Sequence, residues 1–465
     1  MIPFVMRNHN RVYDTQTMIQ VFYPNETYAS VTDVPERGLC VESLLCADCA
    51  EAVLWRDGVR VRSVVEPFGG REARWAAKRA VYALLCAETG LRPAWGMTTG
   101  VRPAKLAREK LDAGVADAAI LAAMTEEYLM QADKAQLALA VAHAEWEILR
   151  TNNGADCALY IGIPFCPTRC AYCSFAATTL TAKTDVDGYL DALEKELDLR
   201  AAQMAGRRLE SVYIGGGTPT ALDERQLARL LGFVRGRFAF DAVKEFTVEA
   251  GRPDTITAEK LGIMKAYGVS RISVNPQTLH DDTLAIIGRR HTAKQFFTAY
   301  ERAVCAGFEN INIDLIAGLP GEDARHMAAT FDGIAALRPN AVTVHTLAVK
   351  RASVLKETLA AQRLTPPDVV EDMLRVTRER CAVMNLRPYY MYRQKNMLGN
   401  FENVGYARTG FEGVYNVQMM EENQTVFAAG AGAVGKRFTP SENRIERLPN
   451  CKDYRDYIKR MGAEV

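Results

Sequence analysis

The sequence predicts an α/β protein whose central part is a partial (β/α)6 barrel, with an N-terminal α+β domain before it and a mixed, mainly helical region after it. Three observations predict this class. Six short runs rich in Val, Ile and Tyr recur between residues 158 and 347. Amphipathic helical patterns separate these runs, and this alternation ends after about residue 365. Strands that alternate with helices form parallel sheets with right-handed crossovers. Six units favour an open or partial barrel over a closed barrel of eight.

The composition is that of a folded protein with several domains. The chain has 465 residues, of which 48% are hydrophobic and 24% charged, and at roughly 150 residues per domain this length allows about three domains. Lys and Arg number 57 against 56 for Asp and Glu, so no nucleic-acid surface is predicted. No apolar run has the length of a signal peptide or a membrane helix. Eleven cysteines without an export signal indicate a cytoplasmic protein whose thiols pack in the core or bind metal.

Residues 1–150 are expected to form the N-terminal α+β extension. Up to about residue 65, apolar and polar residues alternate in short runs such as TMIQVFY (17–23) and VRVRSVV (59–65), a pattern typical of strands. Helical spacing follows from Trp75 to Cys86 and ends at Gly90, and a second helical stretch is expected over about 117–149. A turn-rich linker then leads into the central region.

Residues 151–365 hold the predicted barrel, and residues 366–465 form a C-terminal region on the substrate side. Three of the helices between the strands begin with good capping residues, Asp223, Thr257 and Thr292. The six strands are predicted at 158–164, 211–215, 244–249, 270–274, 310–315 and 341–347.

The loop after the first barrel strand carries three cysteines, Cys166, Cys170 and Cys173, in a C-x3-C-x2-C array. Loops at the carboxyl ends of barrel strands build active sites, and three thiolates can bind three irons of a four-iron, four-sulfur (4Fe–4S) cluster. Core packing is the first alternative, but Pro164 and Pro167 indicate a loop. A zinc site is the second, and it needs a fourth Cys or His, which the loop lacks. The array therefore favours the cluster.

Three protein ligands leave one iron of such a cluster open. An open iron can bind the amino and carboxylate groups of S-adenosylmethionine, whose reductive cleavage yields a carbon radical. Glycines and polar residues follow the other strands, and a glycine run lets the backbone approach a ligand closely. Each of these residues alone is more often a satisfied polar group, but together on one rim they predict a ligand site. They are Gly216, Gly217, Thr218, Glu249, Gln277, Asp314 and His345.

Over about residues 157–440 the sequence resembles the radical S-adenosylmethionine superfamily, in the branch related to oxygen-independent coproporphyrinogen III oxidase. Within that branch it is similar to the coproporphyrinogen dehydrogenase-like group, whose members carry a long N-terminal extension. The resemblance lies in YIGIPFC, GGGTPT, TVEAGRPDT, RISVNPQT, IGRRHT, DLIAGLPGE and GAGA. It implies that Cys166, Cys170 and Cys173 bind the cluster. It also implies S-adenosylmethionine contacts from Tyr160, Gly216, Gly217, Thr218, Glu249, Gln277, Arg289, Asp314 and the backbone near Ala348.

The implied reaction is the oxidative decarboxylation of coproporphyrinogen III propionates to vinyl groups, which gives protoporphyrinogen IX. It implies a tetrapyrrole substrate and an electron donor of the flavodoxin or ferredoxin type, but the sequence assigns no further catalytic residue. Because this substrate carries several carboxylates, basic side chains are expected at the barrel mouth. Candidates are Arg289, Arg290, Lys350, Arg351 and Arg393, for which a solvated surface is the alternative.

Two departures from the family pattern keep other functions open. Established oxidases have a further cysteine where this chain has Phe175. The related heme chaperones carry an HNxxYW motif, where this chain has Tyr415 in place of the histidine and Met419-Met420 in place of the Tyr-Trp pair. A heme-trafficking protein and another radical reaction on a tetrapyrrole therefore remain as alternatives.

A CxxC pair, Cys46 and Cys49, lies in the N-terminal region. It is a candidate second metal or redox site, and packing by small apolar thiols is its alternative.

Overall fold

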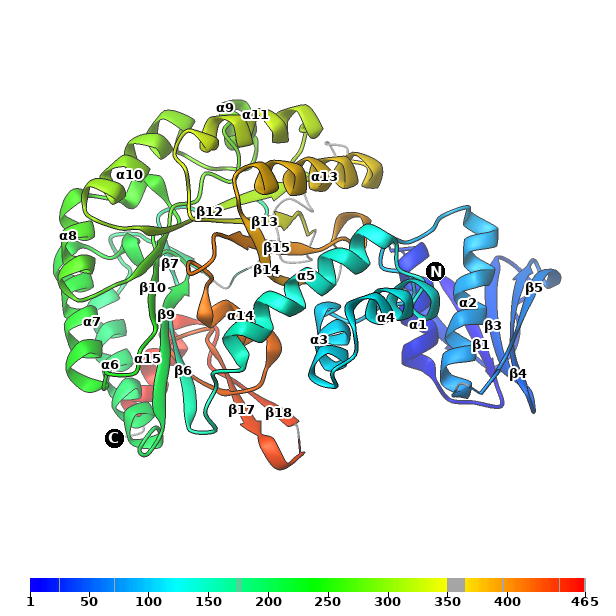
Figure 1. Cartoon of the computed structure of the whole chain (residues 1–465). Helices are drawn as coiled ribbons and strands as arrows, with labels where there is room; N and C mark the ends of the chain where they lie inside the picture. Colours follow the sequence, from blue (N-terminus) through cyan, green and yellow to red (C-terminus); the bar gives the residue numbers. More distant parts are fainter. Residues whose placement is uncertain are drawn as a thin grey trace. The chain divides into compact units, whose positions relative to one another are not determined.

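The computed structural model describes residues 1–24, 26–70, 72–173, 175, 177–348, 364–394, 397–442 and 444–463. The chain forms two compact units, Met1–Leu139 and Ala140–Val465 (Figure 1). Helix α5 (Ala132–Leu149) continues from the first unit into the second. The division into three regions stays a prediction.

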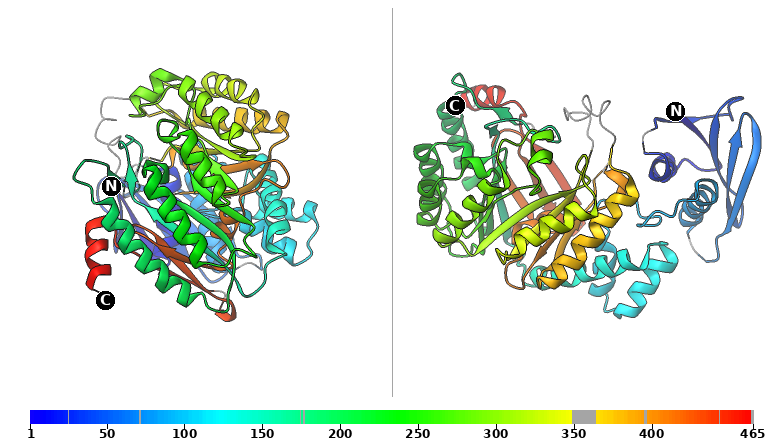
Figure 2. Two further views of the ribbon diagram at one scale, coloured as in Figure 1. Left: turned by 90° about the vertical axis from the view of Figure 1, so that its left-hand side faces the viewer. Right: turned by 90° about the horizontal axis from the view of Figure 1, so that it is seen from above.

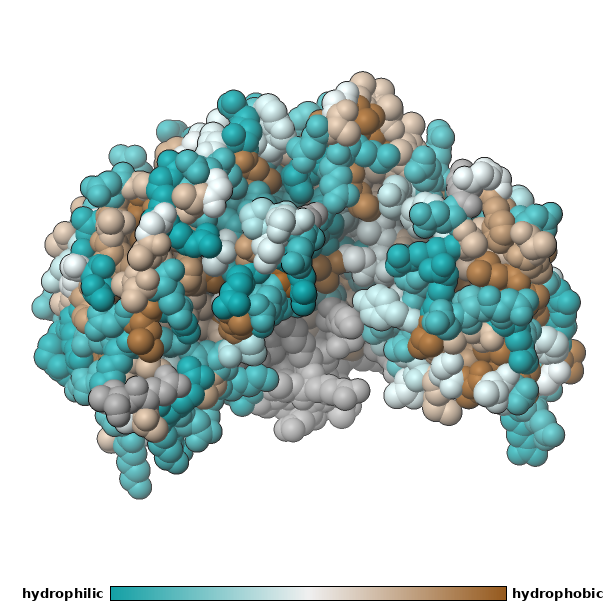
Figure 3. Space-filling view, turned by 90° about the horizontal axis from the view of Figure 1, so that it is seen from below, coloured by the Kyte–Doolittle hydropathy of each residue, from teal (hydrophilic) through white to brown (hydrophobic). Residues whose placement is uncertain are grey.

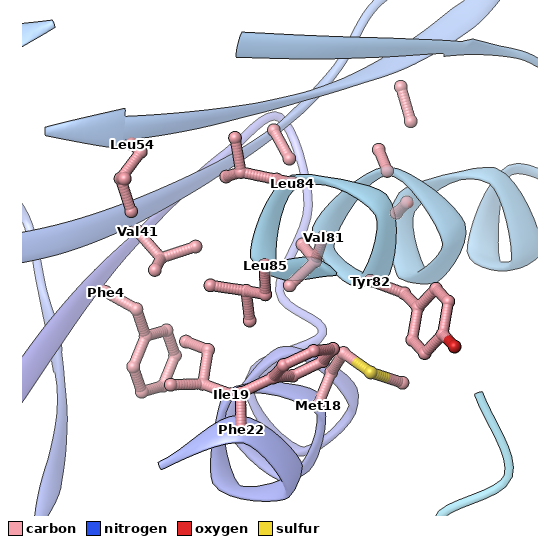
Figure 4. Close-up of a cluster of buried hydrophobic side chains, with 14 of the residues drawn as sticks. Phe4, Met18, Ile19, Phe22, Val41, Leu54, Val81, Tyr82, Leu84 and Leu85 are labelled. Carbon is pink, nitrogen blue, oxygen red and sulfur yellow. The ribbon is translucent and has the colours of Figure 1, made fainter. Parts of the chain in front are cut away.

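The N-terminal unit is a five-stranded sheet with helices packed on it. The strand order is β2-β1-β3-β4-β5, and Phe4, Val41 and Leu54 of the sheet meet Ile19 and Leu85 of the helices in one apolar core (Figure 4). The strands are β1 (Ile2–Arg7), β2 (Tyr28–Val31), β3 (Leu39–Leu45), β4 (Cys49–Arg56) and β5 (Val59–Pro67). The helices are α1 (Val12–Phe22), α2 (Ala73–Thr89), α3 (Ala104–Asp112) and α4 (Asp117–Ala122), with a π-helical turn at Ala123–Glu127.

One predicted strand of this unit is a helix. The run TMIQVFY lies almost entirely within α1, whereas VRVRSVV forms β5 as predicted. The buried residues of α1 are Thr15, Met18, Ile19 and Phe22, which is the three- and four-residue spacing of one helix face. The prediction was wrong because a short apolar run fits both periods, and the packing of this face against the sheet decides between them.

The helical stretch predicted over 117–149 is interrupted. Between the π-helical turn and α5, Leu129 adopts a left-handed conformation with φ of 58°. The segment around Gly96 packs there, since Met97 N–H donates to the Tyr128 carbonyl at 2.9 Å. A Cβ atom on Gly96 would lie 2.1 Å from that carbonyl oxygen, so only glycine allows this contact. The predicted end of α2 at Gly90 is confirmed by its left-handed φ of 73°.

The second unit is built on one eleven-stranded sheet. Its strand order is β14-β15-β13-β12-β11-β10-β9-β6-β16-β17-β18, and the six predicted strands are its consecutive parallel strands β6 and β9–β13. These are β6 (Asp156–Ile163), β9 (Arg208–Gly216), β10 (Glu245–Glu249), β11 (Arg271–Ser273), β12 (Asn310–Ala317) and β13 (Ala341–Thr346). The C-terminal region adds β14 (Arg387–Tyr392), β15 (Asn403–Ala407), β16 (Thr425–Ala429), β17 (Val434–Thr439) and β18 (Arg444–Pro449).

Helices between the parallel strands cover one side of this sheet (Figures 1 and 2). Three of them begin at the predicted caps: Asp223, Thr257 and Thr292 each accept a hydrogen bond from the backbone N–H three residues on. The helices are α6 (Val186–Gln203), α7 (Glu224–Arg237), α8 (Ala258–Ala266), α9 (Asp281–Ile286), α10 (Ala293–Cys305) and α11 (Ala324–Ala335), and α13 (Pro367–Val383) packs on α11. The α/β fold predicted for this part of the chain is confirmed.

Along the parallel strands, buried apolar residues alternate with polar ones. In β10, Phe246 and Val248 point to one face, and Glu245, Thr247 and Glu249 to the other. The strand registers place the polar positions of neighbouring strands side by side. This inner face carries Tyr160, Tyr213, Thr247, Glu249, Arg271, Asn312, Asp314, Thr343 and His345.

Helix α14 (Val414–Glu421) packs where the parallel strands begin. Val414 N–H donates to Glu245 Oε2 at 2.6 Å, and Gln418 Nε2 donates to Glu210 Oε2 at 2.8 Å. Glu210 and Glu245 both lie near the amino ends of their strands. Tyr415 stacks on Tyr213 with ring centroids 4.5 Å apart. This helix therefore covers the end of the barrel opposite to the cysteine loop.

Glu196 of α6 joins four segments of the second unit. Its buried carboxylate accepts hydrogen bonds from Arg200 Nη2 at 2.6 Å, the Gly430 N–H at 2.9 Å, Asn450 Nδ2 at 2.9 Å and the Tyr457 hydroxyl at 2.7 Å. Gly430 follows β16, and Tyr457 belongs to helix α15 (Tyr454–Ala463). The contacts hold α6, the turn after β16 and α15 together.

None of the described helices is long and apolar enough to cross a membrane. Hydrophilic and hydrophobic residues are interspersed over the face seen in Figure 3.

Replacing Glu196 with Ala is expected to lower the free energy of unfolding by about 3 kcal/mol, because it leaves several buried donors without an acceptor. Urea denaturation followed by circular dichroism measures the change. Glu379 is the matched control, since its side chain is 59% exposed and pairs with Arg375 on the surface of α13. Glu379→Ala is expected to change stability by less than about 0.5 kcal/mol. Equal effects of the two changes would contradict the role of Glu196.

Candidate functional site

The three cysteines lie on one tight loop at the carboxyl end of β6. Cys166 ends the two-residue strand β7 (Phe165–Cys166), which pairs with β8 (Thr178–Thr179). Cys173 N–H donates to the Cys170 carbonyl at 3.1 Å, and Ala171 N–H donates to the Ile287 carbonyl at 3.0 Å. These bonds fold the loop back on itself and hold it against the end of α9, so the three cysteines lie on one short, folded segment.

The surroundings of the thiols favour ligands over inert core residues. Burial raises the pKa of the Cys166 and Cys173 thiols, and a buried neutral thiol would suit simple packing. However, Cys166 Sγ lies 3.5 Å from Thr218 Oγ1, and Cys170 Sγ accepts from the guanidinium groups of Arg252 at 3.7 Å and Arg289 at 3.9 Å. Cys170 thus has two guanidinium donors around its sulfur, an environment that a merely packed apolar thiol would not have.

The donor set fits an iron–sulfur cluster better than a single metal ion. In the described part of the chain, no three Cys, His, Asp or Glu side chains are placed to hold one metal ion, and this includes the loop cysteines. A structural zinc ion needs four convergent ligands, whereas each cysteine of a four-iron cluster binds a different iron. Cys166, Cys170 and Cys173 are therefore the residues that could hold such a cluster.

The glycine turn after β9 packs directly against the cysteine loop. Gly217 N–H donates to the Ile163 carbonyl and Thr218 N–H to the Phe165 carbonyl, both at 2.7 Å. A Cβ atom on Gly217 would lie 2.5 Å from the Phe165 oxygen, and Gly216 has φ of 108°. Close approach at one position and backbone conformation at the other both require glycine. The turn thus fixes the loop relative to the sheet.

Glu249 ends β10 on the inner face, beside the glycine turn. Its carboxylate accepts hydrogen bonds from the Tyr213 hydroxyl at 2.7 Å and the Gly216 N–H at 3.2 Å. Burial, with repulsion from Asp314, outweighs these bonds and raises its pKa to about 7. A buried carboxyl that titrates near neutrality is suited to a cationic ligand. Tyr160 is a neighbour, since its ring stacks on Tyr213.

Gln277 and Asp314 meet at the next two strand ends. Gln277 N–H donates to the Asp314 carbonyl at 3.0 Å, and Gln277 has φ of 72°, a strained value for a residue other than glycine. The Asp314 carboxylate accepts from Asn275 Nδ2 at 2.7 Å and Asn312 Nδ2 at 2.6 Å, and it lies 3.8 Å from His345 Nε2. Backbone strain of this kind is concentrated at functional sites.

The remaining predicted contacts lie at the same end of the sheet. Arg289 is buried, and its Nη2 donates to the Gly251 carbonyl at 2.9 Å. Ala348 follows β13 and forms an isolated bridge with Met397. Most of the predicted cofactor residues end or follow a parallel strand, whereas Tyr160 and Asp314 lie within β6 and β12 and Arg289 follows α9. Their ligand roles stay predictions.

The basic residues and methionines that the sequence singled out lie in different environments. Arg290 is exposed to solvent, Arg393 is buried with its pKa lowered to about 10 by burial, and Lys350 and Arg351 lie outside the described residues. Met419 packs beside Tyr415 and Met420 beside Val417, both on α14. They lie at the closed end of the barrel and not at its mouth.

Two residues near the site were missed by the sequence reasoning. Arg252 bonds to Cys170, and Tyr213 bonds to Glu249. Tyr213 had a signal in the alternation of polar and apolar residues along β9, which places it on the same face as Glu249. Arg252 had none, because its partner lies 82 residues away.

The CxxC pair forms the tip of the β3–β4 hairpin. Cys46 N–H donates to the Cys49 carbonyl at 2.9 Å, and Cys46 is exposed while Cys49 is partly exposed. The pair is a turn and not a core segment, and its redox or metal role stays a prediction.

Comparisons with known proteins agree with this geometry. The Radical SAM superfamily model matches residues 160–334. The oxygen-independent coproporphyrinogen-III oxidase-like protein HemZ of Bacillus subtilis is 38% identical over 81% of this chain and 77% of its own length. The heme chaperone HemW of the same organism is 36% identical over 65% of this chain and 76% of its own length.

Coproporphyrinogen III oxidase (HemN) of Escherichia coli has a similar fold. Its structure aligns with a TM-score of 0.53 at 24% identity and covers 70% of this chain and 72% of its own. With the HemZ likeness extending over most of both chains, this chain belongs to the radical S-adenosylmethionine superfamily, in its oxygen-independent coproporphyrinogen III oxidase-like branch.

Proposed function

We propose that this protein is a radical enzyme that converts propionate side chains of coproporphyrinogen III into vinyl groups. The observation that carries the proposal is the convergence of the cysteine loop, the glycine turn and Glu249 at the carboxyl ends of neighbouring strands. The cofactors of the family are a 4Fe–4S cluster and S-adenosylmethionine, which together supply a carbon radical that removes hydrogen from unactivated carbon.

The chain's own residues bind and orient these groups. Cys166, Cys170 and Cys173 would hold the cluster, and the glycine turn fixes their loop through Gly217 and Thr218. Glu249 is oriented by the Tyr213 hydroxyl, and its anionic form would accept a hydrogen bond from the ammonium group of S-adenosylmethionine. The family resemblance assigns further contacts to Tyr160, Gly217, Thr218, Gln277, Arg289, Asp314 and Ala348.

Each propionate would lose one hydrogen atom from its β-carbon, which would end in 5′-deoxyadenosine, with methionine as the other product of S-adenosylmethionine. The carboxylate would then leave as carbon dioxide, and the remaining electron would pass to a one-electron carrier. A flavodoxin- or ferredoxin-type protein supplies the electron that reduces the cluster beforehand. Protoporphyrinogen IX is the product after two such conversions.

The choice of substrate is supported by the reach of the likeness to the oxidase-like HemZ, which extends well beyond the radical core. Heme trafficking is the second candidate, favoured by the similarity to the heme chaperone HemW. Against it, the positions of the chaperone motif serve other purposes in this chain: Tyr415 stacks on Tyr160 and Tyr213, and Met419 packs beside them. Another radical reaction on a tetrapyrrole is the third candidate.

Cys170→Ala is expected to abolish the visible absorbance of the cluster, because a cubane held by two cysteines loses its third iron ligand. Anaerobic reconstitution followed by absorbance and iron analysis measures this. Cys305→Ala is the matched control, since Cys305 is exposed at the end of α10, and it is expected to keep the wild-type iron content. A normal cluster in Cys170→Ala would show that the ligand assignment is wrong.

Binding of S-adenosylmethionine is expected to weaken as the pH falls below about 7. The pKa of Glu249 is about 7, so its anionic form, which attracts the ligand's ammonium group, is lost on acidification. The dissociation constant should rise by about fivefold between pH 7 and pH 6, as measured by anaerobic equilibrium dialysis. Glu249→Gln should bind more weakly at pH 7 and lose most of this dependence. An unchanged pH profile in Glu249→Gln would exclude Glu249 as the titrating group.

The reduced, cluster-loaded protein is expected to form 5′-deoxyadenosine, carbon dioxide and a vinyl-bearing product from coproporphyrinogen III. Chromatography and labelled carbon dioxide capture measure all three, with Cys170→Ala as the inactive control. Formation of 5′-deoxyadenosine without carbon dioxide would exclude decarboxylation and leave another radical reaction. Stable heme binding without cleavage of S-adenosylmethionine would favour the trafficking function instead.

A further inference from the structure

Arg252 is a buried arginine whose guanidinium points at a cysteine sulfur. Its side chain is 3% exposed, and its Nη1 lies 3.7 Å from Cys170 Sγ. A buried charge requires partners, and its partners here come from the cysteine loop and from its own turn. Arg252 lies just after β10, so the contact joins the third parallel strand to the loop that follows the first.

The guanidinium is held in one orientation. Nε and Nη2 each donate to a different oxygen of Asp254 at 3.0 Å, a bidentate pairing. Nη2 also donates to Thr168 Oγ1 at 3.0 Å, and Nη1 to the Thr168 carbonyl at 3.4 Å. Because Asp254 and Thr168 fix the planar group from two sides, Nη1 is left directed at the Cys170 sulfur.

We infer that Arg252 is a positioning residue for the cluster, which orients the Cys170 sulfur and raises the reduction potential of the cluster that this sulfur binds. The inference rests on the proposed cluster site and not on the porphyrinogen substrate. Hydrogen bonds to cluster sulfurs and nearby net charge both set the potential. A fixed cation stabilises the reduced cluster more than the oxidised one, since the reduced form carries one more negative charge.

Arg252 and Arg289 both contact the Cys170 sulfur, but their other hydrogen-bond partners differ. Arg289 also approaches Cys170, at 3.9 Å, but its Nη2 is directed at the Gly251 carbonyl, on the sheet side of the loop. Arg252 instead bonds to the backbone and the side chain of Thr168, inside the cysteine loop itself. Of these two arginines, Arg252 is therefore the one that connects the Cys170 sulfur to the chain segment between Cys166 and Cys170.

The experiment is a potentiometric titration of the reconstituted cluster in the full chain, monitored by electron paramagnetic resonance. Arg252→Gln keeps a hydrogen-bond donor and removes the charge, whereas Arg252→Lys keeps the charge and removes the planar fork. Arg225→Gln is the matched control: it removes the same charge from an exposed pair with Asp187 on the surface of α7. Iron and sulfide per chain and circular dichroism are measured on every variant.

We expect the midpoint potential of Arg252→Gln to fall below that of the wild type, with a smaller fall in Arg252→Lys and none in Arg225→Gln. A tenfold change in the ratio of reduced to oxidised cluster at a fixed potential corresponds to about 59 mV for one electron. Loss of the cluster from a folded Arg252→Gln protein, with retention in Arg252→Lys, would also support the positioning role.

Equal midpoints and equal resonance spectra in wild type, Arg252→Lys and Arg252→Gln would overturn the inference and leave the cluster site intact. If Arg252→Gln does not fold, a wild-type midpoint and spectrum in Arg252→Lys overturn it in the same way. A wild-type chain that assembles no cluster would overturn the site assignment and this inference together.

Discussion

The second unit depends on one constraint, the opposite polarity of the two faces of its parallel strands. Val and Ile positions lie beneath the helices, and the positions between them carry Tyr213, Thr247, Glu249 and Asp314 on the inner face. A shift of one residue in any strand would exchange the two sets. It would bury carboxylates under α7 and α8 and turn the inner face apolar. The pattern therefore sets the register, and the register brings polar groups from distant parts of the chain to one rim.

Local sequence patterns predict the strands and the cysteine loop. This is because the strand period, the helix caps and the spacing of the cysteines each depend on residues that are close together in the sequence. They fail where two periods coincide, as in residues 17–23, and where packing interrupts a helix, as at Leu129. They also say little about pairs that fold into contact. Tyr213 is 36 residues from Glu249, and Arg252 is further still from Cys170, so neither pairing leaves a trace in sequence spacing. The rim was predictable, but the bonds that hold its groups in place were not.

The radical core does not by itself distinguish an oxidase from a heme chaperone, since relatives with both names share it. A fold accommodates several functions, and a function belongs to the residues of its site. In this chain the segment that corresponds to the chaperone motif lies on α14, at the closed end of the barrel, where Tyr415 completes an aromatic stack.

The pairing of β6 with β16 has a consequence for the order of events during synthesis. β6 carries the cysteine loop at its end, yet its parallel neighbour on one side is residues 425–429, and the carboxylate that secures the following turn is bonded to Tyr457. A nascent chain therefore leaves an unpaired strand edge next to its cysteines until residues 425–429 have left the ribosome. Such edges invite aggregation. The edge of β6 beside the cysteine loop is therefore completed only by pairing with a segment more than 250 residues further along the chain.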